Sequence, residues 1–387
     1  MKEKSILFVG QCYYNHYYLS RELRKIGWQA DLLNMDLNPS DQIFYHGQDY
    51  VVSRFTLYGF FKNLIFFICA LFRYNIFHFA NAENLRMAPF CQVPGFYKIF
   101  GKYAEVKFLK FIGKKIFYTN NGCRDGVTIS SFNSWEPYRV CDICPWKNRP
   151  EICSDEKNAK WGKLRNKFCD YIGILGGNRI DYNTASHVHE SPWIYCLDKT
   201  VWNPDIIIPA NYRLPFNKTT IKIFHSVGNY ELRSHGKDLK TIKSTEIWFN
   251  IVNRLKNENY DVELIFFKDV PNSKLKYYQV QADIFVDMLT YGFFGANVRE
   301  AMMLGKPAIC FLRPEWLESM RAEVPDYVKE LPVISATPET AYDELKRLIE
   351  DKSLRESVGF KMRNFGLKWH ASDQAALKAD KIYSKFL

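Results

Sequence analysis

The stretch ADIFVDMLTYGFFGANVREAMMLGKPAICFL, residues 282–312, decides the fold class of this chain. Apolar runs open and close it, and a turn that contains Gly292 and Gly295 follows the first run. Asn297 stands where a helix N-cap belongs, and Glu300, three residues later, completes the pattern of a capping box. The stretch therefore predicts a strand, a loop, a short helix and a second strand.

The same elements can form a binding site. Glycines let the backbone approach a ligand closely, and the free amides at the start of a helix favour an anion or a group rich in hydroxyls. A carboxylate in the first turn, such as that of Glu300, can hold the hydroxyls of a sugar. Asn297 and Glu300 could equally do no more than cap the helix, and the local pattern leaves both interpretations open.

A second informative segment lies upstream, where residues 221–227 (IKIFHSV) alternate like a strand that ends at Gly228 and Asn229. After a charged loop, residues 243–245 (KST) open an amphipathic helix. A fixed cation beside a helix N-terminus, here Lys243, can stabilise a leaving diphosphate without a metal ion. A solvated charged loop is the alternative.

Part of the chain resembles a known family. Residues 295–307 fit the pattern G-x(4)-E-A-M-x-x-G-K-P, through Gly295, Glu300, Ala301, Met302, Gly305, Lys306 and Pro307. This pattern is similar to the signature of the retaining family 4 glycosyltransferases, and residues 243–245 resemble the K-G-T step of that family. The chain departs from the family twice. The first of two paired glutamates is missing, with Gly292 in that region, and Ser244 replaces the glycine of K-G-T.

The resemblance implies roles for individual residues. Glu300 would hold the ribose of a nucleotide-sugar donor, while Lys243 and Arg233 would neutralise its diphosphate. The residues expected near the donor are Gly228, Asn229, Gly292, Gly295, Asn297, Gly10 and Gln11. No D-x-D arrangement is placed to hold a metal on the diphosphate, so we expect no catalytic metal. The implied reaction is a front-face substitution in which the leaving diphosphate helps to deprotonate the acceptor.

The length and the order of predicted elements set the architecture. A chain of 387 residues exceeds one ordinary core, and strands alternate with helices in both halves, as in parallel doubly wound sheets. We predict an α/β protein of two Rossmann-like domains that face each other across a cleft, which the resembling family calls GT-B. Residues 1–210 would form the first domain, with a cysteine-rich loop insertion at about 121–170. Residues 217–365 would form the second, and 366–387 a helix that returns to the first.

Apolar runs give the expected strands in more detail, at residues 5–9, 29–33, 75–79, 115–119, 221–227, 262–267, 284–286 and 308–312, with helices at 15–26 and around 95–112. Open sheets bind ligands beyond the carboxyl ends of their strands, which in the first domain points to Gly10, Gln11, His78 and Asn121. We expect His78 and Asn121 on the acceptor side. His78 could also be a satisfied core histidine, which is the commoner case, and Asn121 part of a plain turn.

Four of the ten cysteines gather in one segment, namely Cys123, Cys141, Cys144 and Cys153, with Cys169 as a substitute. Four thiolates can close a tetrahedral shell, so the spacing predicts a structural zinc site that staples a loop without clear periodicity. Free thiols and an iron–sulfur cluster are alternatives. Disulfides are less expected because no secretion signal is found.

The charge pattern suggests a surface partner. The formal net charge is +11, and residues 98–115 hold six lysines against one glutamate, interleaved with aromatic residues. Such a segment can lie on an anionic membrane surface, where lipid-linked acceptors occur, or can simply be a helix with one solvated face. No run reaches the ~18 apolar residues of a membrane span. We expect a cytoplasmic protein, peripheral on the inner face of the cell membrane, that binds no nucleic acid.

These features together predict a glycosyltransferase that moves a sugar from a nucleotide-diphosphate-sugar to a hydroxyl of a glycan or lipid-linked acceptor, with retention, in the synthesis of a surface polysaccharide. A non-catalytic nucleotide-sugar-binding or glycan-binding protein of the same fold is the alternative. Charge and cysteines alone leave a third interpretation, a zinc-stabilised nucleic-acid-binding protein, whose affinity would fall steeply with salt.

Overall fold

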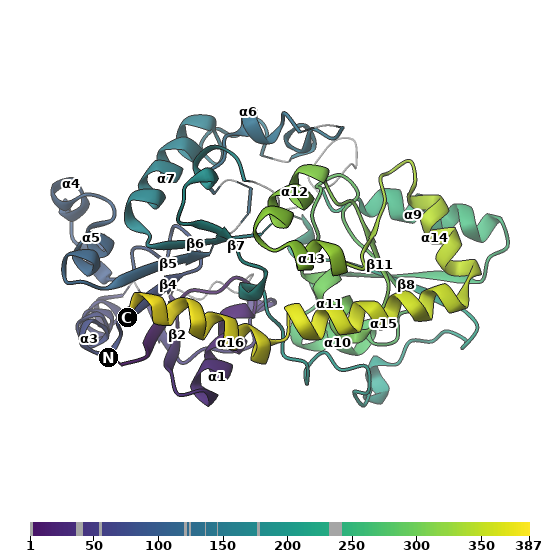
Figure 1. Cartoon of the computed structure of the whole chain (residues 1–387), viewed down its shortest axis with the longest axis horizontal. Helices are drawn as coiled ribbons and strands as arrows, with labels where there is room; N and C mark the ends of the chain where they lie inside the picture. The colour runs from purple at the N-terminus through teal and green to yellow at the C-terminus, as the bar shows by residue number, and fades with distance from the viewer. Residues whose placement is uncertain are drawn as a thin grey trace.

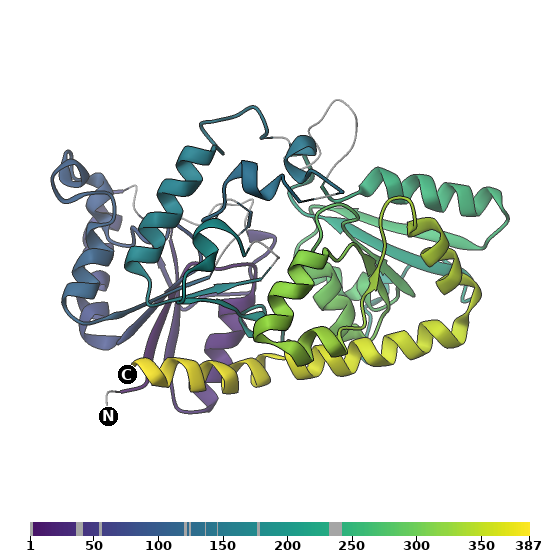
Figure 2. The same cartoon turned by 45° about the horizontal axis from the view of Figure 1, so that its top comes forward.

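Two α/β lobes lie side by side in the computed structural model of the chain (Figure 1). It describes residues 3–387 except for 36–41, 54–55, 120–121, 124, 136, 145, 176–178 and 232–241. The first lobe holds most of the N-terminal half of the chain, and the second lobe holds the strands from residue 221 onward. Figure 2 shows the last two long helices running along one side of both lobes.

A parallel sheet forms the centre of the first lobe. In the described part of the chain it has seven strands, in the order β3-β2-β1-β4-β5-β6-β7. The strands are β1 Ser5–Val9, β2 Gln29–Met35, β3 Tyr50–Val52, β4 Ile76–Phe79, β5 Lys115–Thr119, β6 Tyr171–Ile174 and β7 Val188–Glu190. The sequence predicts β1, β2, β4 and β5, which are apolar runs. It does not predict the short strands β3, β6 and β7.

Helices cover both faces of this sheet, as expected for a doubly wound fold. They are α1 Asn15–Lys25, α3 Leu57–Arg73, α4 Phe96–Phe100, α5 Ala104–Phe111, α6 Ile129–Phe132 and α7 Asp155–Phe168. Short 3₁₀ turns are η1 Pro89–Gln92, η2 Val140–Ile143, η3 Asp181–Thr184, η4 Pro192–Ile194 and η5 Ala210–Tyr212. The single helix predicted around 95–112 is in fact α4 and α5, because Gly101, at a φ of 84°, ends the first of them.

The segment predicted as a cysteine-rich loop is the crossover between β5 and β6. The prediction is wrong for its second part, because α7 is a regular helix of 14 residues. Ser154 caps this helix by accepting a hydrogen bond from the backbone N–H of Lys157, and Asp155 and Glu156 lie in its first turn.

The second lobe is built on another parallel sheet. Among the described residues it has five strands, in the order β12-β11-β10-β8-β9. The strands are β8 Ile221–Val227, β9 Val262–Lys268, β10 Ile284–Val286, β11 Ala308–Cys310 and β12 Ile334–Ser335. The helices are α9 Thr245–Asn257, α10 Asn272–Gln279, α11 Ala296–Leu304, α12 Pro314–Glu323, α13 Pro325–Glu330, α14 Ala341–Glu350 and α15 Lys352–Trp369. All strands of this lobe except β12 match predicted runs, although β9 extends one residue further, to Lys268.

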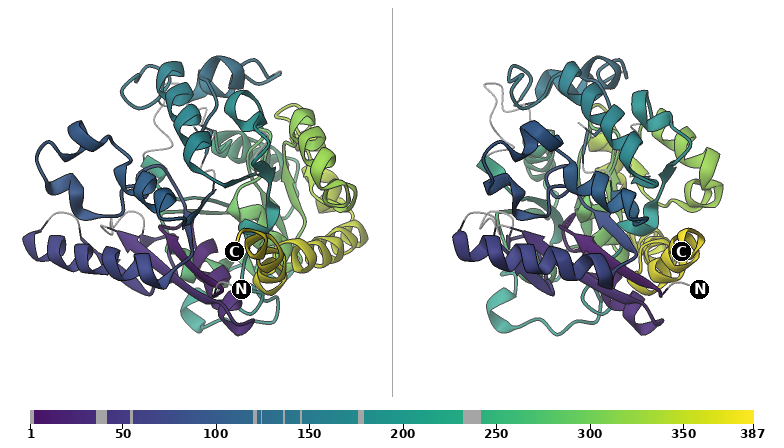
Figure 3. Two further views of the ribbon diagram at one scale, coloured as in Figure 1. Left: turned by 60° about the vertical axis from the view of Figure 1, so that its left-hand side comes forward. Right: turned by 90° about the vertical axis from the view of Figure 1, so that its left-hand side faces the viewer.

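The last helix returns to the first lobe. α16 (Ser372–Tyr383) packs beside α1 and is followed by the turn η6 Ser384–Phe386 (Figure 3). Asp380 accepts hydrogen bonds from Lys4 Nζ and Trp28 Nε1, each at 2.7 Å. Tyr383 is fully buried, and its hydroxyl lies 2.7 Å from Nδ1 of His78 on β4.

One apolar core runs through both lobes. Buried side chains of β1 and α1 join those of α11, α15 and α16 in a single cluster, so the lobes share packing as well as polar contacts. Smaller cores fill the other faces of the two sheets. None of the described helices combines the length and the apolar character that crossing a bilayer requires.

Candidate functional site

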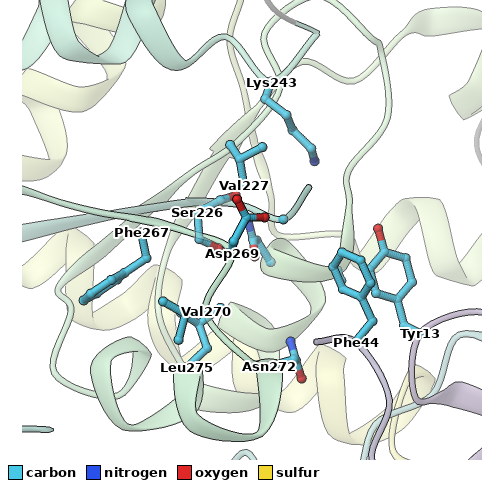
Figure 4. Close-up of a pocket in the computed structure, with 13 residues that line it drawn as sticks. Tyr13, Phe44, Ser226, Val227, Lys243, Phe267, Asp269, Val270, Asn272 and Leu275 are labelled. Carbon is cyan, nitrogen blue, oxygen red and sulfur yellow. Dashed lines mark hydrogen bonds between the residues drawn. The ribbon is translucent and has the colours of Figure 1, made fainter. Parts of the chain in front are cut away.

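A pocket opens at the carboxyl end of β8, where the second lobe faces the first (Figure 4). Most of its wall belongs to the second lobe. Tyr13 and Phe44 come from the first lobe and lie edge to face, with ring centroids 5.0 Å apart. The lining residues are Tyr13, Phe44, Ser226, Val227, Gly228, Lys243, Phe267, Asp269, Val270, Asn272, Leu275, Ala296 and Asn297. Parallel sheets bind ligands at this end, which makes the pocket the candidate site.

Lys243 brings a positive charge into the pocket. Its Nζ lies 3.2 Å from Oδ1 of Asp287, whose side chain is fully buried at the carboxyl end of β10. The other oxygen, Oδ2, accepts a hydrogen bond from the N–H of Gly295 at 3.0 Å. Asp287 therefore holds the lysine beside the start of α11, where the helix dipole adds partial positive charge. Asp287 balances the charge of Lys243, and the ammonium and the start of α11 are the groups of this corner that could contact an anion.

Ser244 occupies the position of the glycine in the resembling K-G-T step. Its φ is 57°, a left-handed conformation that glycine adopts without steric cost. Its Oγ accepts a hydrogen bond from the N–H of Leu289 at 2.9 Å, which secures the loop after β10. Next to it, Thr245 Oγ1 lies 2.9 Å from Nε2 of His225. The backbone conformation that the glycine would provide is thus retained by a serine with a hydrogen bond of its own.

Glu300 lies at the centre of a buried network. Its carboxylate accepts hydrogen bonds from Tyr14 Oη at 2.9 Å, Asn272 Nδ2 at 2.8 Å and Gln279 Nε2 at 2.5 Å. Burial raises the pKa of Glu300, and the three hydrogen bonds oppose the rise. Tyr14 belongs to the first lobe, so this carboxylate also connects the lobes. Asn272 lies between Glu300 and the pocket, because it contacts both.

The predicted capping box is wrong. The N-cap of α11 is Gly295, and Asn297 already lies inside the helix. Asn297 Nδ2 donates to the backbone oxygen of Ser226 at 2.9 Å, and its Oδ1 accepts from Ser226 Oγ at 2.9 Å. These bonds connect α11 to the end of β8. The oxygens of Glu300 are engaged by the network described above and do not turn back to the helix start.

The glycines of the site permit close packing. A Cβ on Gly292, at a φ of 88°, would lie 2.6 Å from the side chain of Arg313. A Cβ on Gly295 would lie 3.2 Å from Nζ of Lys243. Gly228 lines the pocket, and a Cβ there would lie 2.5 Å from the ring of Phe44. The close neighbours of Gly228 and Gly295 are thus side chains of the chain itself, and contact of these glycines with a donor stays a prediction.

The remaining predicted residues lie apart from this pocket or outside the described chain. Asn229 follows Gly228 with a φ of 52° and is not among the residues that line the pocket. Gly10, at a φ of 79°, and Gln11, whose Nε2 donates to the backbone oxygen of Gly47 at 3.0 Å, follow β1 in the first lobe. Arg233 and Asn121 lie outside the described residues.

His78 is fully buried on β4. Its ring nitrogens lie 2.7 Å from the hydroxyls of Tyr383 and Thr119, and burial holds its pKa well below the usual value. This environment agrees with the core interpretation. A role for His78 on the acceptor side stays a prediction.

The four clustered cysteines lie in the crossover after β5. The N–H of Cys144 donates to the backbone oxygen of Cys141 at 3.3 Å, and Cys123 and Cys141 pack against the same small apolar cluster. Burial, followed by the charges of Cys123, Cys144 and Cys153, raises the pKa of Cys141 to about 12. The thiols of Cys123, Cys144 and Cys153 are therefore close enough to Cys141 for their charges to affect it. Yet no three His, Cys, Asp or Glu side chains of the described residues are arranged to hold a metal ion.

Sequence patterns missed several residues of the site. Asp287 is one, although it directly follows an apolar strand, where ligand-binding residues of open sheets gather. Tyr13 and Tyr14 also follow a strand, in the loop after β1. Phe44 and Asn272 have no comparable signal, because their places depend on how the lobes meet.

The sequence matches no protein-family model, and no curated protein is significantly similar to it. Solved structures share its fold. Sucrose-phosphate synthase of Thermosynechococcus elongatus is 12% identical with a TM-score of 0.58, over 99% of each chain. Anabaena HepE in complex with UDP is 10% identical with a TM-score of 0.59, over 99% of this chain and 100% of that one. A complex of HepE with UDP-glucose gives a TM-score of 0.54. These likenesses confirm the predicted fold class, two parallel α/β domains in the GT-B arrangement.

Proposed function

We propose that this chain is a glycosyltransferase that moves a sugar from a nucleotide-diphosphate-sugar to an acceptor hydroxyl. The observation that carries the proposal is the position of Lys243, 3.2 Å from Asp287 and beside the N–H of Gly295, in a pocket at the carboxyl ends of the strands. An ammonium at the start of a helix suits a diphosphate, although the N–H of Gly295 itself is engaged by Asp287. HepE, which has the same fold, was solved with UDP and with UDP-glucose, and this supports a nucleotide-sugar as the co-substrate.

The donor would place its diphosphate at Lys243, with Arg233 as a second cation, and its ribose at Glu300. For a ribose hydroxyl to reach Glu300, one of the three hydrogen bonds to its carboxylate has to open. The bond from Tyr14 is the one that comes from the opposite lobe. Separation of the lobes would break it while leaving Asn272 and Gln279 in place. Gly228, Asn229, Gly292 and Asn297 would shape the backbone around the donor.

The proposed reaction retains the configuration of the sugar, as the family resemblance implies. The acceptor hydroxyl attacks the sugar carbon on the face from which the diphosphate departs. The bond from that carbon to the phosphate oxygen breaks, a bond to the acceptor oxygen forms, and the acceptor proton passes to the departing phosphate oxygen. Lys243 stabilises the charge that develops on the diphosphate, so no catalytic metal is expected.

The acceptor would be a glycan or a lipid-linked glycan, and the product part of a surface polysaccharide. Its side of the cleft would be the first lobe, with His78 on β4 and, by its place in the sequence, Asn121 as the predicted acceptor-side residues. A cytoplasmic protein that is peripheral on an anionic membrane would meet such an acceptor. The basic aromatic segment 98–115 supports this location.

A structural zinc site at Cys123, Cys141, Cys144 and Cys153 remains part of the proposal. Its support is the electrostatic contact among the four thiols and the turn that joins Cys141 to Cys144. Binding of zinc would require the thiols to draw together, because the described side chains do not form a coordinating group.

A thermal-shift screen against UDP-, GDP-, CMP-, ADP- and dTDP-sugars tests the donor site. A ligand at about 100 times its dissociation constant should add ~2.7 kcal/mol to the stability. Lys243→Ala should abolish the shift, while Lys274→Ala, which removes an exposed lysine on α10, should keep it. If no nucleotide-sugar stabilises the wild type, the proposal fails. Binding without transfer to any glycan would identify the non-catalytic alternative, and salt-sensitive binding to nucleic acid alone would identify the third.

A further inference from the structure

The outward face of α3 is apolar. Leu57, Phe61, Ile65 and Phe72 are 75%, 56%, 63% and 86% exposed. They recur at intervals of four or seven residues, which brings them to one side of the helix. Helices that cover a sheet normally turn such a face inward and leave polar side chains outside. The outward face of α3 therefore departs from the usual pattern.

The inward face of α3 is mixed in character. Its fully buried residues are Gly59, Asn63, Phe67 and Ala70, and Phe66 and Leu71 pack against the same core. Asn63 is fully buried, and neither atom of its amide has a hydrogen-bond partner among the described residues. A helix that only had to cover the sheet would gain from the opposite arrangement, because a buried amide without partners is costly.

The apolar surface continues onto α4 and α5. Ile99 and Phe111 are 77% and 87% exposed, and Phe100, Phe108 and Ile112 are exposed as well. The three helices lie together at the end of the first lobe that points away from the second lobe (Figures 1 and 3).

Aromatic contacts hold the three helices beside one another. Phe90 of η1 contacts Phe67 of α3 at a centroid distance of 6.2 Å and stacks on Phe96 of α4 at 4.5 Å. Nζ of Lys107 on α5 donates to the backbone oxygen of Phe100 at 3.3 Å. Most of the large hydrophobic side chains that are exposed in the described chain belong to this region. A patch of this kind on a soluble surface marks an interaction site.

Positive charge accompanies the apolar residues. Lys62 is exposed on α3, and Lys98, Lys102 and Lys107 are exposed on and around α4 and α5. Glu105, the one acidic residue between positions 98 and 115, is buried and accepts a hydrogen bond from Tyr97. The surface therefore offers apolar side chains and ammonium groups, with no exposed carboxylate in that stretch.

We infer that the exposed apolar residues of α3, α4 and α5, together with the lysines among them, form a face that docks on an anionic lipid bilayer. Apolar side chains enter the boundary between headgroups and acyl chains, while lysines contact anionic headgroups. A second copy of the chain is a poorer partner, because a two-fold interface would bring this lysine-rich surface against itself. The inference names a partner for the proposed transferase, although the binding itself requires neither donor nor acceptor.

Flotation of the full chain with vesicles tests the inference. We expect binding to vesicles that contain one third phosphatidylglycerol in phosphatidylcholine, and about tenfold weaker binding to phosphatidylcholine alone or at high salt. The triple variant Phe61→Ser, Ile65→Ser, Phe72→Ser should lose binding. The matched control is Ile207→Ser with Phe360→Ser, two side chains that are 90% and 70% exposed outside α3, α4 and α5, and it should bind like the wild type. A charge variant, Lys98→Glu with Lys107→Glu, should lose the preference for anionic vesicles.

Two outcomes would overturn the inference. One is equal flotation of the wild type and the triple variant, provided that both unfold at the same temperature. The other is a wild type that ignores vesicles but forms a dimer that the triple variant loses. The donor screen is unaffected by either result, so failure of the membrane face and failure of the transferase proposal can be told apart.

Discussion

The hydroxyl of Tyr14 donates a hydrogen bond to Oε1 of Glu300 across 2.9 Å, which joins the loop after β1 in one lobe to α11 in the other. Both side chains are buried, and Glu300 is fully enclosed. The residue that the family resemblance assigns to the donor ribose is therefore also a contact between the lobes. Donor binding and the separation of the lobes should be coupled through this carboxylate.

Replacing Tyr14 by Phe removes one donor from Glu300 and leaves Asn272 and Gln279. We expect the free energy of unfolding to fall by about 1.5–3 kcal/mol, the usual contribution of a hydrogen bond to a charged group. Nucleotide binding should tighten, because the ribose no longer competes with the tyrosine. Isothermal titration calorimetry and denaturant unfolding measure both effects. Tyr17→Phe, in the first turn of α1, is the control, and weaker nucleotide binding in Tyr14→Phe would contradict the coupling.

The pair of Lys243 and Asp287 allows stability to be separated from function. Lys243→Met leaves the buried carboxylate of Asp287 with the N–H of Gly295 as its hydrogen-bond donor among the described residues. The free energy of unfolding should therefore fall by about 3 kcal/mol. Adding Asp287→Asn removes the uncompensated charge, so the double variant should recover most of that loss. Neither variant should bind a nucleotide-sugar. Recovery of donor binding in the double variant would show that the lysine has no part in it.

Substitutions of Ser244 test two opposing effects on the stability of the protein. Ser244→Gly relieves a left-handed conformation that costs about 1 kcal/mol, but it also removes the partner of the buried N–H of Leu289, which costs about 1–3 kcal/mol. The loss is larger, so restoring the family glycine should destabilise the protein. Ser244→Ala loses the bond and keeps the strain, and should be less stable than Ser244→Gly by about 1 kcal/mol. Thermal unfolding of the three proteins gives the order, and a glycine variant more stable than the wild type would refute it.

Glu190 should make stability depend on pH. It is buried where β7 meets α12, accepts a hydrogen bond from Ser319 Oγ at 2.5 Å, and lies near Glu323 and Arg179. Burial is the main cause that raises its pKa from 4.5 to about 7. The folded chain then binds more protons than the unfolded chain between these values, so this group lowers the stability by about 3 kcal/mol as the pH rises through that interval. Glu190→Gln should remove the loss.

Denaturant unfolding at pH 5 and pH 7.5 measures this difference. The wild type and Glu190→Gln must be compared at both values, because other buried groups titrate as well. An unchanged pH dependence in the variant would show that Glu190 does not carry the effect.

Metal analysis tests the cysteine cluster. Protein purified without chelator should hold one zinc ion per chain, and Cys141→Ser should lose it, while Cys69→Ser, an exposed thiol on α3, should keep it. Loss of the ion should lower the melting temperature. A wild type that neither retains zinc nor binds it on titration would favour free thiols.

The sequence predicted the strands and turns that apolar runs and glycines define. β1, β8 and β10 are buried runs, and Gly305 ends α11 with a φ of 68° as expected. α7 was not predicted because the residues on its buried face are mostly polar or small, so the sequence shows no helical period of apolar residues. Its start, Ser154 followed by two acidic residues, was a signal that could have found it.

The geometry of the site was harder to predict. Asn297 looked like a cap because short polar residues favour that place. The N-cap is Gly295, two residues earlier, and the amide of Asn297 bonds to the end of β8 instead. The partners of Glu300 are distant in sequence, with Tyr14 from the other lobe. Contacts between the two lobes depend on how the lobes pack together, and local sequence patterns do not encode that packing.

The return of α16 has a consequence for the order in which the protein folds on the ribosome. Tyr383 completes the packing around His78 on β4, and Asp380 accepts hydrogen bonds from Lys4 before β1 and Trp28 before β2. The first lobe is translated first but lacks part of its interior until residues 372–383 have emerged. The second lobe holds its own sheet and can close earlier. We therefore expect the first lobe to finish folding only when α16 packs against it. Nascent chains that stop before residue 372 should need chaperones to protect the incomplete first lobe.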